Sequence, residues 1–186
     1  MLQITGSLHN LRSTQIVGGN VACGSDGPHI TDIALTYPLV HLDHALVRPL
    51  FKGTSFAGYS SSGDYYKWGL VDEGTLRVEV LRTMFNTTSL AKQFWEVTEY
   101  LQCRGKVVAA TTITGNTAAD FDVTISPPAG ARLTRTQAAL SCQPLDNQGN
   151  YLRVGLSLPD VNTVRFGVGS VGGNTSKPVQ AELLFF

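Results

Sequence analysis

The sequence predicts a mainly β protein, an antiparallel β-sandwich of jelly-roll type. The first observation is a repeated alternation of apolar and polar residues, which places one set of side chains on each face of a strand. The second is that turn-forming residues separate the alternating runs, as at 127–130 and 172–174. The third is composition, because 19 glycines with many Thr, Ser and Asn residues suit strands and turns better than helices. Several short strands at this spacing are typical of a sandwich or barrel.

The N-terminal part is less regular than the rest. We expect an irregular portion or arm with short strands over residues 1–60 and a β-sandwich domain over residues 61–186, within one compact unit. Residues 7–30 are rich in Gly, Asn and Ser and lack periodicity. They are interpreted either as a loop of the same subunit or as an arm that reaches a neighbouring subunit. Pro38 and Pro49 restrict the apolar stretch that follows to short pieces.

An aromatic cluster comes next along the chain. It consists of Tyr59, in a Gly- and Ser-rich loop, and of Tyr65, Tyr66 and Trp68 directly after it. One interpretation is a contact surface for a partner or receptor, because Tyr and Trp bring large contact areas at small entropic cost. The alternative, which we prefer, is packing in the core or at a sheet edge.

Residues 86–105 are the stretch where a helix competes with a strand. The spacing of one helical face is shown by Leu90, Phe94, Val97 and Leu101. The rival is a strand over 94–103, which the aromatic and β-branched residues favour and in which Glu99 is the one misplaced charge. Both remain open, so a short helix near 88–103 is one of two expectations.

Strands are expected in the remaining alternating runs, at 75–80, 106–114, 121–125, 152–158, 164–168 and 179–185. The last run ends in Leu183, Leu184, Phe185 and Phe186. Large apolar side chains beside a carboxylate are costly to leave in water. We therefore expect a closing strand covered by its own sheet and by a second subunit, which makes these four residues a predicted oligomer interface.

The C-terminal pattern runs Phe-Asp-Val-Thr-Ile at 121–125, a Pro/Gly turn, a Leu-rich strand, Asn-Thr-Val-Arg-Phe at 162–166, a Gly/Asn/Thr loop and a closing apolar strand. This order, over residues 106–186, resembles a β-module of virion proteins of tailed bacteriophages. The resemblance implies a structural protein of the virion, in head decoration, capsid cementing, tail or fibre, assembled in the bacterial cytoplasm. It implies no chemistry and no cofactor. The partners we expect are copies of itself, as a homotrimer, and other capsid or tail proteins.

The alternative function is a receptor- or carbohydrate-binding module of a tail fibre or spike, with the aromatic cluster stacked on sugar rings. An enzyme lacks an adequate constellation. Ser60, Ser61 and Ser62 lack the second glycine of a nucleophile elbow, and the G-x-G-x-x-G motif at 167–172 is followed by no helix. His41, Asp43 and His44, like the pair Asp120 and Asp122, are too few to predict a metal site. We expect no catalytic residue and no bound metal.

Charge and cysteine content exclude further classes. Lys and Arg total 14, as do Asp and Glu, so a formal net charge of zero offers nothing to nucleic acid or an anionic membrane. No apolar run approaches the roughly 20 residues that span a bilayer. Cys23, Cys103 and Cys142 are too scattered for a disulfide framework or a zinc site and suggest buried thiols in a reducing compartment.

Overall fold

The computed structural model describes residues 10–23, 27–50, 64–81, 89–114, 119–144, 154–169 and 176–186. Most of these residues form strands, which are β1 (Leu11–Cys23), β2 (His29–Ala34), β3 (Ala45–Pro49), β4 (Tyr65–Asp72), β5 (Thr75–Leu81), β6 (Ser89–Tyr100), β7 (Gly105–Thr114), β8 (Ala119–Thr124), β9 (Thr136–Pro144), β10 (Val154–Asp160), β11 (Thr163–Val168) and β12 (Ser176–Phe185). Two short 3-10 turns, η2 (Leu42–His44) and η3 (Leu133–Arg135), precede β3 and β9.

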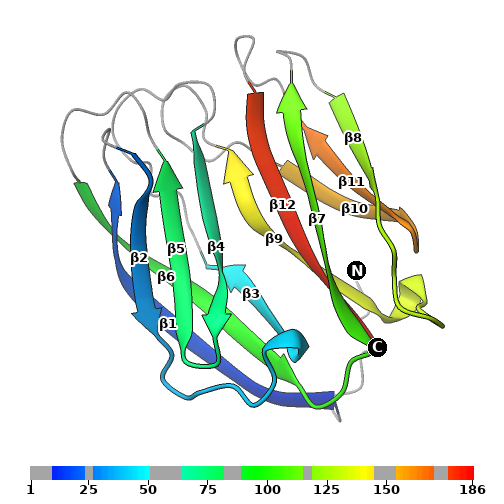
Figure 1. The fold of residues 1–186 in the computed structure, drawn as a ribbon, viewed down its shortest axis with the longest axis horizontal. Coiled ribbons are helices and arrows are strands. Elements are labelled where there is room, and N and C mark those ends of the chain that lie inside the picture. The colour runs from blue at the N-terminus through cyan, green and yellow to red at the C-terminus, as the bar shows by residue number, and fades with distance from the viewer. Residues whose placement is uncertain are drawn as a thin grey trace.

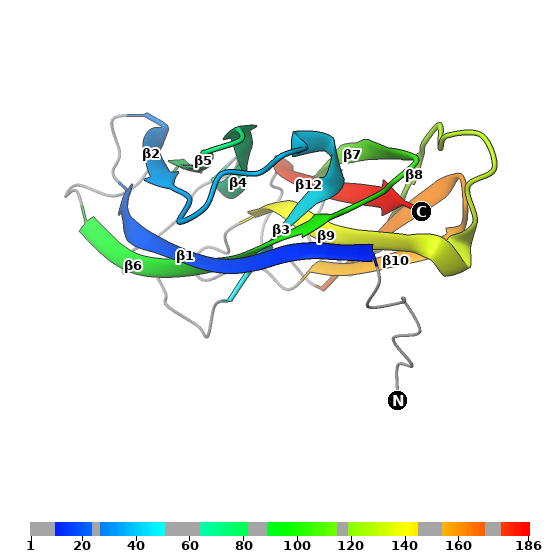
Figure 2. The same cartoon turned by 90° about the horizontal axis from the view of Figure 1, so that it is seen from below.

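The strands form antiparallel sheets in two layers (Figure 1). One layer is a six-stranded sheet in the order β2-β5-β4-β9-β12-β7. The other layer contains two three-stranded sheets, β1-β6-β3 against the β2-β5-β4 side and β10-β11-β8 against the β9-β12-β7 side (Figure 2). The prediction of a mainly β, antiparallel sandwich is confirmed.

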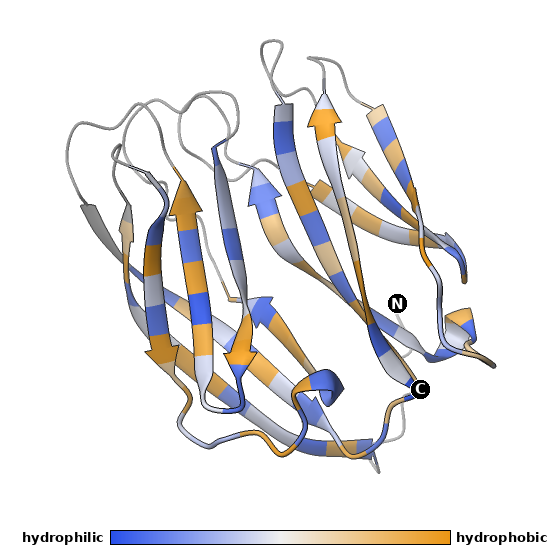
Figure 3. Cartoon of the chain, viewed as in Figure 1, coloured by the Kyte–Doolittle hydropathy of each residue, from blue (hydrophilic) through white to orange (hydrophobic). Residues whose placement is uncertain are grey.

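Each half of the sandwich encloses an apolar core. The N-terminal core, between β1-β6-β3 and β2-β5-β4, contains Tyr66, Trp68 and Trp95 among its buried residues. The C-terminal core, between β10-β11-β8 and β9-β12-β7, contains Phe166 and Phe185. Figure 3 shows the cause, since hydrophobic and hydrophilic residues alternate along strands of both halves. A period of two turns every second side chain inward.

The strands expected in the C-terminal part are present. Their predicted inward faces are buried on β11 and β12, at Val164, Phe166, Val168, Val179, Ala181, Leu183 and Phe185. These runs are short and carry a polar residue at almost every second position, so their alternation is visible in the sequence.

The helix considered near 88–103 is wrong, because residues 89–100 form strand β6, which pairs with β1 on one side and β3 on the other. Burial alternates over 92–97 as a strand requires, with Trp95 and Val97 buried and Lys92 and Phe94 exposed, whereas 97–100 are buried on both faces. Phe94 and Val97 are three residues apart and so face opposite sides of the sheet. The apparent helical stripe was a coincidence of spacing.

The loop or arm expected at 7–30 is wrong for β1, which pairs with β6 along its whole length. Gly18 and Gly19 hide its alternation in the sequence, and both lie close to neighbouring side chains. A Cβ on Gly18 would lie 2.5 Å from Cδ1 of Phe94, and one on Gly19 would lie 3.0 Å from Cδ1 of Ile33. The described residues of 1–60 are therefore not an arm, because β1 and β3 flank β6 and β2 pairs with β5.

Candidate interaction surface

Strand β12 lies inside the six-stranded sheet, between β9 and β7. Leu183 and Phe185 belong to the C-terminal core, and Leu184 packs on the opposite face in a cluster with Leu46, Tyr100 and Ala139. Leu183 and Leu184 are 0% exposed and Phe185 is 1% exposed. The predicted oligomer interface is therefore corrected for Leu183, Leu184 and Phe185, because the chain itself covers both faces of the strand. Phe186 is half-buried, with its ring 4.9 Å from that of Tyr100.

The aromatic cluster is divided between core and surface. Tyr66 and Trp68 are buried in the N-terminal core with ring centroids 5.5 Å apart, so the packing interpretation holds and the contact surface is wrong for these two. Tyr65 is half-buried and its hydroxyl donates to Glu79. Burial, reinforced by the Glu79 carboxylate, raises the pKa of Tyr65 well above its ordinary value. Tyr59 lies outside the described residues.

The histidine cluster sits at the turn η2. The rings of His41 and His44 are 4.8 Å apart, and the thiol of Cys103 donates to the carbonyl of Asp43 at 3.3 Å. Among the described residues, no group of three or more His, Cys, Asp or Glu side chains is arranged to hold a metal ion.

Asp120 and Asp122 share a face of β8, as expected, and Arg165 of β11 binds both. The guanidinium contacts the Asp122 carboxylate at 2.7 and 2.8 Å and Asp120 at 3.7 Å. The hydrogen bond from Arg165 lowers the pKa of Asp122. The other half of the sandwich carries a matching pair, in which Arg77 contacts Asp32 at 2.8 Å through two nitrogens. Arg165 thus engages the two carboxylates that the sequence offered for chemistry.

The remaining catalytic candidates are only partly described. Ser60, Ser61 and Ser62 lie outside the described residues, as does the second half of the glycine motif. Its first half, with Gly167 and Gly169, lines an open depression together with Ala119, Asp120 and Val168.

The surroundings of the two described cysteines favour the neutral thiol. Cys142 is buried, and desolvation raises its pKa to about 12. Cys103 is half-buried, and desolvation again raises its pKa. Because the thiolate is the reactive form, neither environment suits a nucleophile.

Glu99 is a buried carboxylate with a structural task. Its side chain is 2% exposed and points into the N-terminal half from β6. One oxygen accepts the amides of Val40 and His41 at 2.8 Å each, and the other lies 3.3 Å from Nε of Arg12. Glu99 thus holds the chain before η2 against β6, which explains the charge that seemed misplaced in a strand. Sequence reasoning missed this role because the partners are backbone amides far along the chain.

The outer face of β1-β6-β3 is the exposed apolar surface that sequence reasoning did not find. Ile16, Leu50 and Phe94 form its exposed apolar part and are 62%, 45% and 43% exposed, whereas Leu46 and Tyr100 at the other end of the face are covered by Ala139 and Leu184. They are neighbours: the amide of Leu50 donates to the carbonyl of Phe94 at 2.9 Å, and Phe94 pairs with Gly18 of β1. Ile16 lies one row further along, opposite Glu96.

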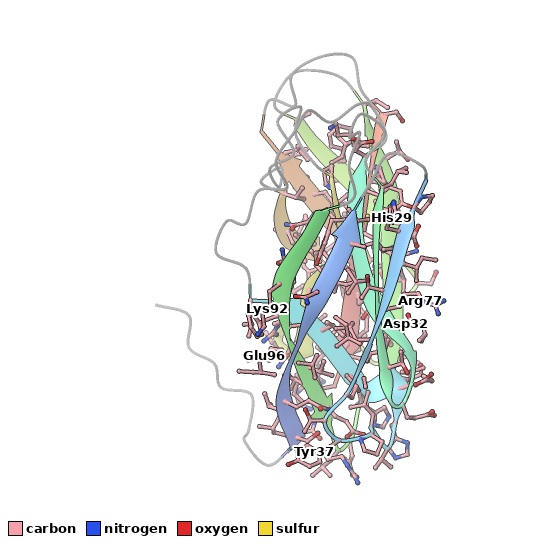
Figure 4. All side chains as sticks on the ribbon, turned by 90° about the vertical axis from the view of Figure 1, so that its left-hand side faces the viewer. His29, Asp32, Tyr37, Arg77, Lys92 and Glu96 are labelled. Atoms are coloured by element: carbon pink, nitrogen blue, oxygen red, sulfur yellow. The ribbon has the colours of Figure 1, made fainter. Side chains whose placement is uncertain are left out.

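Charged residues surround this apolar centre. Nζ of Lys92 lies 5.5 Å from the ring centroid of Phe94, and Arg48 approaches Glu96 at 3.8 Å. Figure 4 shows Lys92 and Glu96 on one side of the molecule and Asp32 with Arg77 on the opposite side. The signal was present in the sequence as Lys92-x-Phe94-x-Glu96, but the helical alternative would bring Lys92 and Glu96 together and turn Phe94 away from both.

Comparisons with protein-family models, curated proteins and solved structures find no match.

Within the described residues, no helix is long and apolar enough to cross a membrane.

Proposed function

We propose that the protein is a structural subunit of a tailed-bacteriophage virion. It decorates or cements the capsid, or forms part of the tail or fibre, and it acts by contact with virion proteins and with copies of itself. Catalysis is not part of this role. The sequence supports the proposal through the resemblance of residues 106–186 to phage virion β-modules.

The observation that carries the proposal is the outer face of β1-β6-β3. Ile16, Leu50 and Phe94 form an apolar centre with Arg48, Lys92 and Glu96 around it. An apolar centre with a polar rim is the usual anatomy of a protein contact surface. A net charge of zero removes a common barrier to close association, which suits a protein that works within an assembly.

The alternative, a receptor- or carbohydrate-binding module, has weaker support. Two of its four contact residues, Tyr66 and Trp68, are buried in the core and cannot stack on a sugar ring without unfolding. Tyr65 keeps only part of its surface and uses its hydroxyl on Glu79.

The test is particle association. Particles from a bacterial host that carries the gene are purified on a density gradient and probed with an antibody raised against the purified protein. We expect the protein to sediment with the particles and to remain after a high-salt wash. A protein that stays entirely in the soluble fraction contradicts the proposal.

A matched pair of variants tests whether the outer face is used. Ile16→Asp changes the outer face of β1-β6-β3, whereas Ile30→Asp changes β2 in the other layer at similar exposure, 57% against 62%. We expect Ile16→Asp to reduce the particle-bound fraction at least tenfold and Ile30→Asp to leave it unchanged. Equal behaviour of the two variants would show that another surface makes the contact.

A further inference from the structure

We propose that the outer face of β1-β6-β3 binds the same face of a second copy in a two-fold dimer. The two β6 strands cross antiparallel, Phe94 packs on Phe94 of the partner subunit, and each Lys92 lies opposite Glu96 of the partner subunit. This proposal deepens the proposed function by naming the partner of that face.

The order of residues along β6 carries the argument. Lys92, Phe94 and Glu96 are two apart and so project from the same face of the strand. Phe94 is midway between a positive and a negative side chain, each about 7 Å away along the strand. A two-fold axis that crosses β6 at Phe94, in the plane between the copies, exchanges the positions of Lys92 and Glu96. The face is therefore complementary in charge to itself.

The other way to stack two copies is unfavourable. An axis parallel to β6 keeps the strands in the same direction and sets Lys92 opposite Lys92 of the partner subunit and Glu96 opposite Glu96 of the partner subunit. Like charges in direct opposition across an interface are repulsive. Charge pattern thus selects both the partner, a second copy, and the antiparallel orientation.

The apolar centre fits this arrangement. Phe94 lies over Gly18, which has no side chain, so its ring can approach a facing sheet closely. Leu50 extends the same row and Ile16 flanks it. Two offset aromatic rings stabilise a contact beyond the apolar area that they bury.

The Arg48–Glu96 contact leaves room for a second cation. The distance of 3.8 Å between Nη1 and Oε1 is longer than a hydrogen bond. A carboxylate offers about four acceptor positions, so Glu96 accepts Lys92 of the partner subunit without losing Arg48.

The size of the face limits the affinity of the proposed dimer. Three strands about 4.8 Å apart and about seven residues along each cover well under the roughly 800 Å² per partner of a standard interface. We therefore expect a weak dimer that depends on concentration. On a particle, where copies are held close together, the same contact gains from a high effective concentration. The symmetry is two-fold and replaces the homotrimer expected from the sequence, because this face matches itself only in an isologous contact.

The decisive experiment is a charge exchange, read by sedimentation equilibrium of the whole protein from micromolar to near-millimolar concentration. We expect wild type to dimerise, and Lys92→Glu and Glu96→Lys each to raise the dimer dissociation constant at least tenfold, because each change sets like charges opposite twice per dimer. The double variant Lys92→Glu/Glu96→Lys should regain the wild-type constant within about threefold, since the opposition of charges is restored.

Two controls keep the test specific. Glu73→Lys makes the same charge change as Glu96→Lys, but on an exposed turn between β4 and β5, away from the face. It should leave the dissociation constant unchanged. Far-ultraviolet circular dichroism and thermal unfolding confirm that each variant is folded.

The proposal is overturned by a wild-type protein that stays monomeric or forms trimers, or by a folded double variant that does not recover. A monomer that nevertheless sediments with particles would leave the virion role standing and remove only the dimer. A dimer that is absent from particles would do the reverse.

Discussion

The N-terminal and C-terminal halves of the molecule have the same sheet arrangement but differ in which faces of their strands are buried. Both place a three-stranded sheet against one side of the shared six-stranded sheet, and both carry a two-nitrogen Arg–Asp pair, Arg77–Asp32 in one half and Arg165–Asp122 in the other. In the C-terminal half, the chain end is buried on both faces of β12. In the N-terminal half, β6 buries one face in the core, and its other face is exposed at Phe94 but covered at Tyr100 by Ala139 and Leu184.

The difference shows that a strongly apolar run in a sequence indicates a central strand buried on both faces in preference to an oligomer interface. β12 is apolar because it has a core on one side and a second cluster on the other. The exposed face of β1-β6-β3 has a more mixed sequence, with glycines and charges around a few apolar residues. A contact surface must also be soluble, so its sequence is less hydrophobic than that of a buried strand.

The comparison is tested most severely by deleting residues 183–186. Three of the four side chains are essentially fully buried, and truncating a buried Leu or Phe to Ala costs about 2–5 kcal/mol each. The sum approaches the roughly 5–15 kcal/mol that stabilises a whole domain. We expect the truncated protein not to fold as a monomer, by circular dichroism and proton NMR dispersion. Phe186→Ala, at the half-buried terminal position, should still fold; a folded truncation would restore the chain end as a candidate interface.

The next largest effects on stability come from core variants that test whether the two halves unfold together. Trp68→Ala in the N-terminal core and Phe185→Ala in the C-terminal core should each lower the free energy of unfolding by about 3–5 kcal/mol. Trp68 and Trp95 both lie in the N-terminal core, so tryptophan fluorescence reports on that half. Because the six-stranded sheet is continuous, Phe185→Ala should shift the fluorescence midpoint in urea as much as the circular dichroism midpoint.

Val108→Ala, at an exposed position of β7, is the control for these core variants and should change stability by less than about 0.5 kcal/mol. If Phe185→Ala moved only the circular dichroism transition, the halves would be independent folding units.

Glu99 sharpens the comparison, because in the N-terminal half a buried carboxylate holds the chain before η2 against β6. Glu99→Ala leaves the amides of Val40 and His41 without their acceptor. We expect a loss of about 3 kcal/mol, since a buried group left without a partner costs about 1–3 kcal/mol. Glu99→Gln, which keeps one acceptor oxygen, should cost less. Hydrogen exchange at the Val40 and His41 amides, faster in Glu99→Ala than in wild type, provides the local measurement.

The smallest effects come from the two exposed Arg–Asp pairs. The arginine hydrogen bonds lower the pKa of Asp32 and of Asp122 in the folded protein. A lowered folded-state pKa gives stability that is present above the ordinary value near 3.8 and is lost as the pH falls through the folded-state pKa. Carboxyl NMR titration should place both midpoints below that value, and about 1 M salt should raise them. Arg77→Gln should return Asp32 toward its ordinary value and leave Asp122 unchanged; a shift of both would mean the pairs are not independent.

Sequence alone determined the fold class and most of the C-terminal strands, because their alternation with a period of two is a local property of successive residues. The sequence could not identify β1, in which Gly18 and Gly19 lie against the side chains of Phe94 and Ile33. Nor could it identify the role of Glu99, which accepts hydrogen bonds from the amides of residues 59 and 58 positions away.

Only the tertiary structure decided which apolar residues are covered. Leu183, Leu184, Tyr66 and Trp68 are as hydrophobic or aromatic as Ile16 and Phe94, yet the first four lie in cores and the last two lie on the surface. The physical reason is that burial depends on which strand becomes the neighbour and which sheet lies opposite. Those choices arise from packing between residues far apart in the chain, and no local pattern encodes them.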